Sequence, residues 1–187
     1  APTQSSSPVE DRVQNFVRLR EATSTMSATV AVSLQAAFEP FGVRVRHPAE
    51  ISTPDFEHDS IILLGGPWVN PWVQLFEDSL DFRTFAPPGG APSEIHVAHV
   101  KPGERAVYAA GTKNGIEVSY LRVAVQPNLS RKGKVILIGG IKGASQEAGC
   151  NFLLDPARVD EILQRFGVSD VAHLPPFELL FEVRGVA

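Results

Sequence analysis

The chain has 187 residues, of which 43% are hydrophobic and 20% are charged, and its formal net charge is −4. This length and composition predict a folded chain that buries one sizeable core and exclude disorder over most of its length. The slight acidity offers no positive field for a phosphate backbone, so direct contact with nucleic acid is not expected. No apolar run reaches the roughly 18 residues of a membrane span, and no span is expected in this segment.

The start of the sequence differs in chemistry from the rest. Ser, Thr, Gln and Pro dominate its first eight residues, which is typical of a linker. We therefore expect a linker or tail at 1–12 and a single domain at 13–187. This start also suggests a processed protein or an excised piece of a longer one.

Strands and helices alternate in the outer thirds of the sequence. Hydrophobic spacing, helix caps and glycine stops predict, in chain order, a strand at 14–20, an amphipathic helix at 28–41, strands at 43–46 and 60–64, a helix opened by Asn70 and Pro71, a strand at 135–138, helices at 144–154 and 156–166, and a strand at 177–183. The buried face of the helix that follows Asn70 is expected to consist of Trp72, Leu75, Phe76 and Leu80.

The middle third has the chemistry of hairpins. Short strands are predicted at 81–86, 94–100 and 105–110, and a longer strand at 116–125 precedes a polar loop at 126–134. The apolar run at 60–64 is typical of a strand covered on both faces, which places it at the sheet centre. These patterns predict an α/β fold with a three-layer, mostly parallel sheet of about five parallel strands, like flavodoxin or Rossmann folds, and an antiparallel hairpin insertion in the middle third.

Two glycine turns follow the two buried strands. Ligands of parallel sheets bind where strands lead into helix N-termini, and glycine lets the backbone approach an anion closely. The predicted ligand-binding residues are Gly65, Gly66, Pro67, Trp68, Asn70, Gly139, Gly140, Lys142 and Gly143, with Thr23 and Ser24 on the same edge. The alternative is that both turns serve only tight packing between strand and helix.

Motifs for chemistry are absent from the sequence. It has no G-x-G-x-x-G fingerprint, no P-loop and no G-x-S-x-G elbow, so neither a cofactor nor a catalytic residue is predicted. Cys150 lies in a helical pattern typical of buried filler. His96 and His99 fall on opposite faces of a predicted strand, and no metal site is expected.

Two short motifs resemble a bacterial family that has no assigned activity. Residues 65–72 read GGPWVNPW, residues 127–130 read PNLS, and a buried strand then leads into Gly139 and Gly140. Members of that family carry a GGPxxNPW segment and a PNLS segment, and the similarity runs from about Phe16 to the C-terminus. The resemblance implies the C-terminal, extracytoplasmic part of longer regulators that have a DNA-binding domain and a membrane segment. It supplies no reaction and no catalytic residues.

Three functions fit these observations. The first is a non-catalytic ligand-binding or sensory domain that holds a small polar or anionic molecule at the glycine turns. The second is an enzyme that acts on a nucleotide or sugar phosphate at the same turns, and the third is a protein-interaction module. A protein partner or a homodimer is compatible with each, and the compartment is either extracytoplasmic, as part of a membrane-linked protein, or cytoplasmic.

Overall fold

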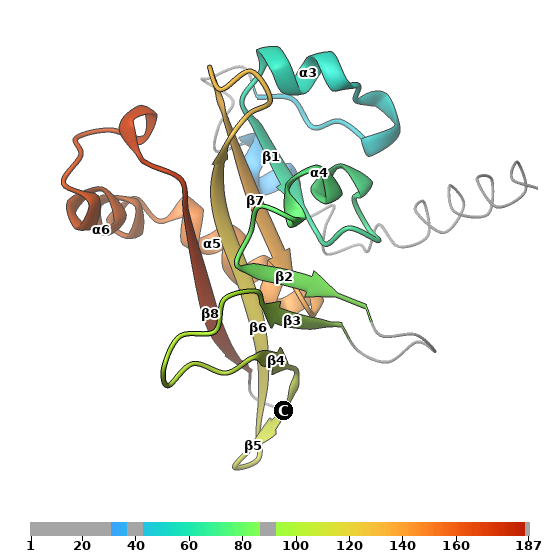
Figure 1. Ribbon diagram of the computed structural model, residues 1–187, viewed down its shortest axis with the longest axis vertical. Helices are drawn as coiled ribbons and strands as arrows, with labels where there is room; N and C mark the ends of the chain where they lie inside the picture. Colours follow the sequence, from blue (N-terminus) through green and yellow to red (C-terminus); the bar gives the residue numbers. More distant parts are fainter. Residues whose placement is uncertain (1–30, 37–42, 87–92, 186–187) are drawn as a thin grey trace, which may run out of the picture.

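The computed structural model describes residues 31–36, 43–86 and 93–185 (Figure 1). The predicted strand at 14–20 and most of the predicted helix at 28–41 lie outside these residues; residues 31–36 are helical. The other elements, in chain order, are η2 (Pro48–Glu50), α3 (Thr53–His58), β1 (Ile61–Leu64), η3 (Pro71–Val73), α4 (Gln74–Glu77), β2 (Phe82–Phe85), β3 (Glu94–Val97), β4 (Val107–Ala109), β5 (Gly111–Lys113), β6 (Ile116–Pro127), β7 (Lys134–Gly140), α5 (Gly143–Leu154), α6 (Pro156–Phe166), η5 (Val171–His173) and β8 (Phe177–Gly185).

The main sheet, here called sheet A, is built around β6. It has five strands: β1, β7, β6 and β5 follow one another in the order of pairing, and β8 also pairs with β6 (Figure 1). Only β1 and β7 are parallel, whereas β6 runs antiparallel to β5, β7 and β8. The predicted mostly parallel, flavodoxin- or Rossmann-like sheet is therefore wrong, and β1, predicted at the sheet centre, pairs with β7 alone among the described strands.

The antiparallel arrangement follows from a short connection. Pro127 pairs with Lys134, so β6 and β7 form a hairpin across the polar loop. A hairpin reverses the chain direction, whereas a parallel neighbour needs a crossover of a dozen or more residues. The parallel pair of β1 and β7 meets that requirement, because the second sheet and β6 lie between them in the chain.

The second sheet, here called sheet B, contains β2, β3 and β4 in that order, all antiparallel. It accounts for the hairpin chemistry predicted in the middle third. Its buried Ile95 packs with Val118 and Tyr120 of β6, and Phe82 and Tyr108 pack against that cluster. Sheet B thus lies against one face of sheet A.

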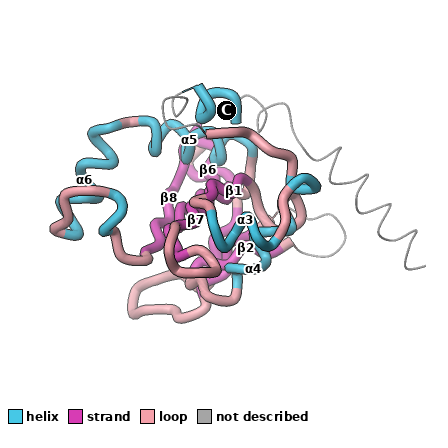
Figure 2. Tube along the Cα trace, turned by 90° about the horizontal axis from the view of Figure 1, so that it is seen from above, coloured by secondary structure: helices cyan, strands magenta, loops and turns pink. Residues whose placement is uncertain are grey.

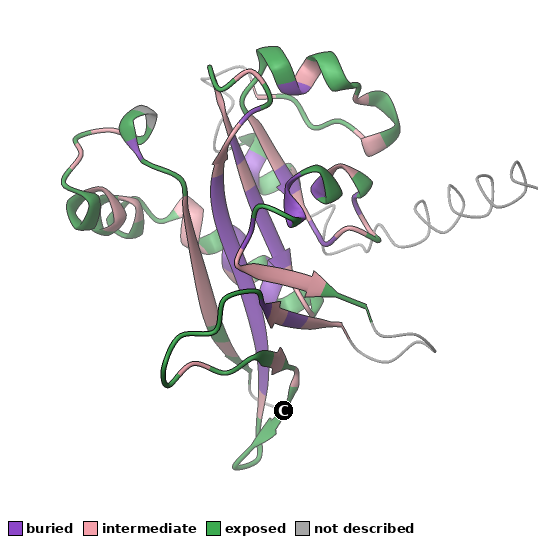
Figure 3. Ribbon diagram, viewed as in Figure 1, coloured by how far each residue is buried: buried purple, intermediate pink, exposed green. Residues whose placement is uncertain are grey.

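The core occupies both faces of sheet A. On one face Leu121, Ile138 and Cys150 belong to a cluster that joins α5 to the strands, and α3 and α4 cover the other face (Figure 2). A Cβ added at Gly149 of α5 would lie 2.7 Å from Leu121 and 2.8 Å from Ile138, so this glycine permits the close contact of helix and sheet. Buried residues concentrate in β6 and β7 (Figure 3).

The helix caps and the glycine stop were predicted correctly, unlike the sheet topology. The Asn70 side chain caps η3 by accepting from Trp72 N at 3.2 Å, and Asp155 caps α6. Gly167 ends α6 in the left-handed region at φ 65°. Two predictions were wrong: residues 43–46 form no strand, and Leu75 is 50% exposed. Among the described helices none combines the length and apolarity that a membrane crossing requires.

Candidate functional site

A buried guanidinium lies between the two sheets. Arg122 stands in the middle of β6 with 0% exposure and is the largest of the fully buried side chains. Its Nη1 donates to Glu77 Oε1 and to the carbonyl oxygen of Phe82, both at 2.8 Å. Among the described residues its Nε and Nη2 have no hydrogen-bond partner. No signal in the sequence points to this residue, because an arginine is rarely buried and its partners Glu77 and Phe82 lie far away in the chain.

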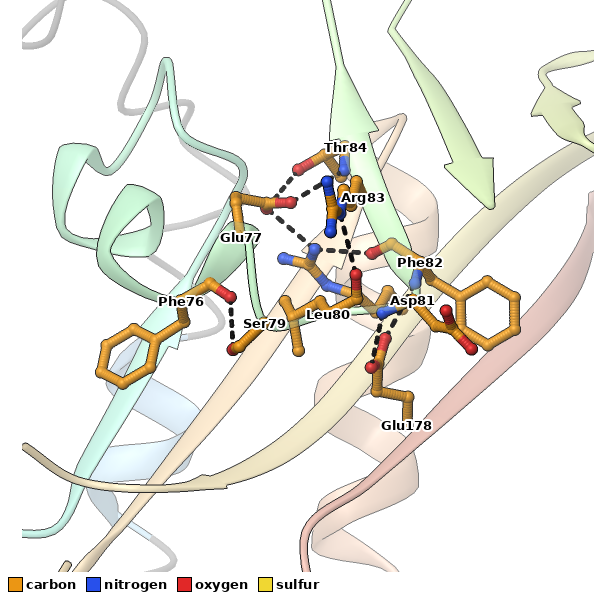
Figure 4. Close-up of polar contacts among 10 residues, drawn as sticks. Phe76, Glu77, Ser79, Leu80, Asp81, Phe82, Arg83, Thr84 and Glu178 are labelled. Carbon is orange, nitrogen blue, oxygen red and sulfur yellow. Dashed lines mark hydrogen bonds and ion pairs between the residues drawn. The ribbon is translucent and has the colours of Figure 1, made fainter. Parts of the chain in front are cut away.

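Glu77 connects this arginine to α4 and β2. The carboxylate is 4% exposed and accepts from Thr84 Oγ1 at 2.7 Å and from Thr84 N at 3.1 Å (Figure 4). Three donors therefore surround it, counting Arg122 Nη1. A buried carboxylate needs such partners to offset the loss of its hydration.

These side chains also close the outer edge of sheet B. Phe82 and Thr84 face Val97 and Ile95 of β3 in positions without backbone hydrogen bonds to that strand, since Val97 N donates to Ala106 O instead. Their backbone groups therefore point away from β3. Glu178 of β8 accepts from Phe82 N at 2.9 Å, Arg122 donates to Phe82 O, and Glu77 accepts from Thr84 N. Charged side chains thus occupy the place of a neighbouring strand and fix sheet B to sheet A (Figure 4).

A groove of about 380 Å³ opens beside this cluster, between α4 and sheet B. This volume lies within the range of about 300–1,000 Å³ that is typical of small-molecule sites. Its lining residues are Gln74, Glu77, Asp78, Arg83, Thr84, Phe85, His96, Val97 and Ala98. We call this feature the α4 groove.

The α4 groove offers both charges and an aromatic wall. Arg83 donates Nε to Leu80 O at 2.9 Å and Nη2 to Asp78 O at 2.8 Å, which fixes the guanidinium through backbone carbonyls rather than through a carboxylate. His96 Nε2 lies 2.8 Å from a carboxylate oxygen of Glu94. The His96 ring also packs against Phe85 at a tilt of 36°, with 4.7 Å between ring centroids. An acidic ligand group would meet an oriented cation here.

The first glycine turn is filled by its own backbone and by Trp68. Gly65 has φ 94°, a conformation that favours glycine, and its N–H donates to Ile138 O at 2.9 Å. Gly66 O accepts from the backbone N–H of Asn70 at 2.8 Å, and a Cβ on Gly66 would lie 3.2 Å from the Trp68 ring. Pro67 is half-buried in this turn. The turn is therefore compact, and its Trp68 is 39% exposed.

The second glycine turn packs against the start of α5. A Cβ on Gly140 would lie 2.6 Å from Gln146 N and 2.9 Å from Ser145 Oγ, so the backbone approaches the helix closely. Ser145 Oγ accepts from Lys142 N at 3.1 Å, and the Lys142 ammonium pairs with Glu117. The Lys142 ammonium, predicted to attract an anion, thus pairs with Glu117 at the surface, and Gly143 is an exposed first residue of α5.

The structure brings the two turns together but not with the α4 groove. Gly65 O lies 3.5 Å from a Cβ placed on Gly139, and Arg122 Nη2 lies 3.4 Å from the same position. None of the predicted ligand-binding residues lines the groove. Gly66 comes close to one groove residue, because a Cβ on Gly66 would lie 3.7 Å from Oγ1 of Thr84, which lines the groove. Thr23 and Ser24 lie outside the described residues, and ligand binding at the turns stays a prediction.

The PNLS segment has a structural role. Asn128 is 2% exposed; its Nδ2 donates to Asp59 O at 3.1 Å, and its Oδ1 accepts from Gly133 N at 3.1 Å. Leu129 N donates to Phe56 O at 3.0 Å. The segment therefore clamps the β6–β7 hairpin to the end of α3.

Other candidate groups give no second site. Burial raises the pKa of the Cys150 thiol to about 12, so the buried cysteine is held as an unreactive thiol. His99 pairs with Asp81 at 2.7 Å on the surface. Within residues 31–36, 43–86 and 93–185, no group of three or more His, Cys, Asp or Glu side chains could hold a metal ion.

Fold and site together define a mixed α/β domain with one largely antiparallel sheet, a smaller antiparallel sheet and a polar groove beside the second. Comparison of the chain with protein-family models, curated proteins and solved structures finds no match. The function must therefore be argued from the groove itself.

Proposed function

We propose that this chain is a non-catalytic ligand-binding domain that holds a small polar molecule with a carboxylate or phosphate group in the α4 groove. The observation that carries the proposal is the Arg83 guanidinium, which two backbone carbonyls orient at the groove wall without neutralising its charge. A fixed guanidinium recognises carboxylate and phosphate groups with directed hydrogen bonds.

Further groups in the groove suit the rest of such a ligand. Gln74 supplies an amide, Asp78 a carboxylate, and the packed rings of Phe85 and His96 an apolar surface. The buried pair of Glu77 and Arg122 holds the floor in place. Because Arg83 and Asp78 come from segments anchored by that pair, the ligand meets a preorganised surface.

A second candidate is an enzyme that acts on a nucleotide or sugar phosphate. The observation that favours it is the contact between His96 and Glu94, since a carboxylate that orients a histidine is a common feature of general bases. Substituting His96→Asn separates the two functions. A ligand-binding domain keeps most of its affinity in this variant, whereas an enzyme loses turnover.

The proposal is tested by filling the groove. Ala98 is an exposed lining residue, so Ala98→Trp occupies the groove without removing a described side-chain contact. Ala109→Trp on β4 adds the same side chain at an exposed position that does not line the groove. Thermal-shift screening of both variants and of the wild type uses sugar phosphates, nucleotides, dicarboxylates and amino acids.

A ligand at 100 times its Kd stabilises the native state by about 2.7 kcal/mol. We expect stabilisation of the wild type and of Ala109→Trp, and none of a folded Ala98→Trp. Equal stabilisation of all three proteins would place the ligand elsewhere, and stabilisation of none by any compound would refute the proposal.

A further inference from the structure

The outer edge of β8 has no strand partner among the described residues. β8 runs from Phe177 to Gly185 and pairs through residues 177–185 with β6 alone. The strand contains neither proline nor a break in register. An exposed edge of this length presents a row of backbone donors and acceptors and is a template for another strand.

Hydrogen-bond directions show which β8 residues face outward. The Tyr120 carbonyl accepts from Ile141 N at 3.1 Å, so Tyr120 faces β7. Backbone groups alternate along a strand, so Leu121 faces β8, where Phe181 is its partner. The backbone N–H and C=O groups of Leu180 and Glu182 therefore point to the outer edge.

The side chains of β8 are complementary in the antiparallel register that matches the whole strand. If Phe181 faces Phe181 of a second copy, Glu178 faces Arg184 and Leu180 faces Glu182, and symmetry repeats each pair. Within one copy Glu178 accepts from the backbone N–H groups of Asp81 and Phe82, and Arg184 pairs with Glu182. A shift that centres the pairing on Leu180 would place Glu178 opposite Glu182, and a shift to Glu182 would place that carboxylate opposite its own copy. Like charges directly opposite destabilise strand pairing. A register centred on Val183 would place Glu182 opposite Arg184 but would match only residues 181–185 of β8, whereas the register centred on Phe181 matches the whole strand without a like-charge pair.

We propose that two copies of this chain pair antiparallel through the outer edges of β8, in the register centred on Phe181. The pairing joins the two five-stranded sheets into one continuous sheet. It also places Phe181 beside its own copy, and this ring already stacks on Phe152 of α5 with 4.7 Å between centroids. A two-fold interface of this kind is isologous, because the same edge serves both copies.

Proline at an outward-facing position tests the interface. Glu182 is exposed, and its N–H faces the outer edge rather than β6, so Glu182→Pro removes a donor from the interface and keeps the ladder to β6. Glu182→Ala removes the same side chain, including its contact with the Tyr120 hydroxyl, but keeps the N–H. The assay is molar mass by light scattering during size-exclusion chromatography, with circular dichroism to confirm folding.

We expect the wild type and Glu182→Ala to have twice the 20.2 kDa mass of the chain, and Glu182→Pro to have the mass of one chain. A charge reversal, Arg184→Glu, should weaken the dimer about tenfold because two like-charge pairs replace two opposite pairs. Lys101→Glu, at an exposed turn, makes the same charge change and should leave the dimer intact. A monomeric wild type at roughly 100 µM, or a folded dimeric Glu182→Pro, would overturn the proposal.

Discussion

The buried pair of Glu77 and Arg122 permits a quantitative prediction. Glu77→Gln keeps the size of the side chain but removes the only carboxylate that pairs with Arg122 within the described residues. The guanidinium is 0% exposed and already has two nitrogens without a partner. Leaving a buried charge uncompensated costs about 3–5 kcal/mol, and we expect Glu77→Gln to lower the free energy of unfolding by that amount.

Substitution of Arg122 should have a different effect on stability alone than together with the substitution of Glu77. Arg122→Met alone leaves the Glu77 carboxylate with its two Thr84 donors and without a counterion, which we expect to cost about 2–4 kcal/mol. The double variant removes both charges together with the unpartnered nitrogens of Arg122. It should therefore lose about 1–2 kcal/mol, less than either single variant.

Urea unfolding at constant pH measures all four proteins of this double-mutant cycle. Additive losses in the double variant would show that the two side chains do not interact energetically. A loss below about 1 kcal/mol in Glu77→Gln would show that solvent reaches the guanidinium, and either result would refute the reasoning.

Three further predictions concern packing and protonation. Gly149→Ala should destabilise by about 1–3 kcal/mol in thermal unfolding, because its Cβ overlaps the sheet, whereas Gly111→Ala, where a Cβ meets nothing within 4 Å, should change little. Cys150 should react with a thiol reagent only as fast as the protein unfolds, since burial raises its pKa to about 12; fast native labelling would contradict this burial. The Ser52 hydroxyl and then the Ser52 N–H lower the pKa of Asp55 from 3.8 to about 2, so its contribution to stability is present above pH 3.8 and is lost as the pH falls towards 2. Asp55→Asn should remove that part of the acid dependence, and an unchanged unfolding profile between these pH values would contradict the assignment.

Local structure could be predicted where one residue determines it. A proline after a capping Asn or Asp marks the starts of η3 and α6, and a left-handed glycine marks the end of α6, so Asn70, Asp155 and Gly167 were correctly interpreted. These signals depend on the backbone within one helical turn. They carry no information about which strands pair.

The predicted sheet topology was wrong because a strand with an apolar sequence was taken to be the central strand. The apolar run of β1 packs against a core cluster on each face, yet it is short and, among the described strands, has a partner on one side only. β6 is the central strand, but it carries the buried polar residues Ser119 and Arg122, one on each face, and such residues in a strand pattern are typical of exposed positions. Their partners, Ser145 at 2.8 Å and Glu77, come from distant parts of the chain. The polar loop before β7 was the available signal for a hairpin.

The candidate site could not be predicted for a similar reason. The α4 groove depends on sheet B lying beside α4, and the contacts that place it there join residues 45 and 40 positions apart in the sequence, as Arg122 does with Glu77 and Phe82. The glycine turns were recognised as special backbone, correctly for the left-handed Gly65. The N–H groups of Gly65 and Asn70 and the Lys142 ammonium, however, are engaged with the protein's own groups.

The most direct test of the central claim is a nuclear magnetic resonance titration of the 20.2 kDa chain with succinate and with glucose 6-phosphate, followed through backbone amide shifts. The account predicts saturable shifts at Arg83, His96 and Ala98 for at least one of the two compounds. Shifts confined to the amides of Gly66 and Gly140 would instead place the ligand at the glycine turns. The absence of saturable shifts at the α4 groove with either compound would contradict binding there.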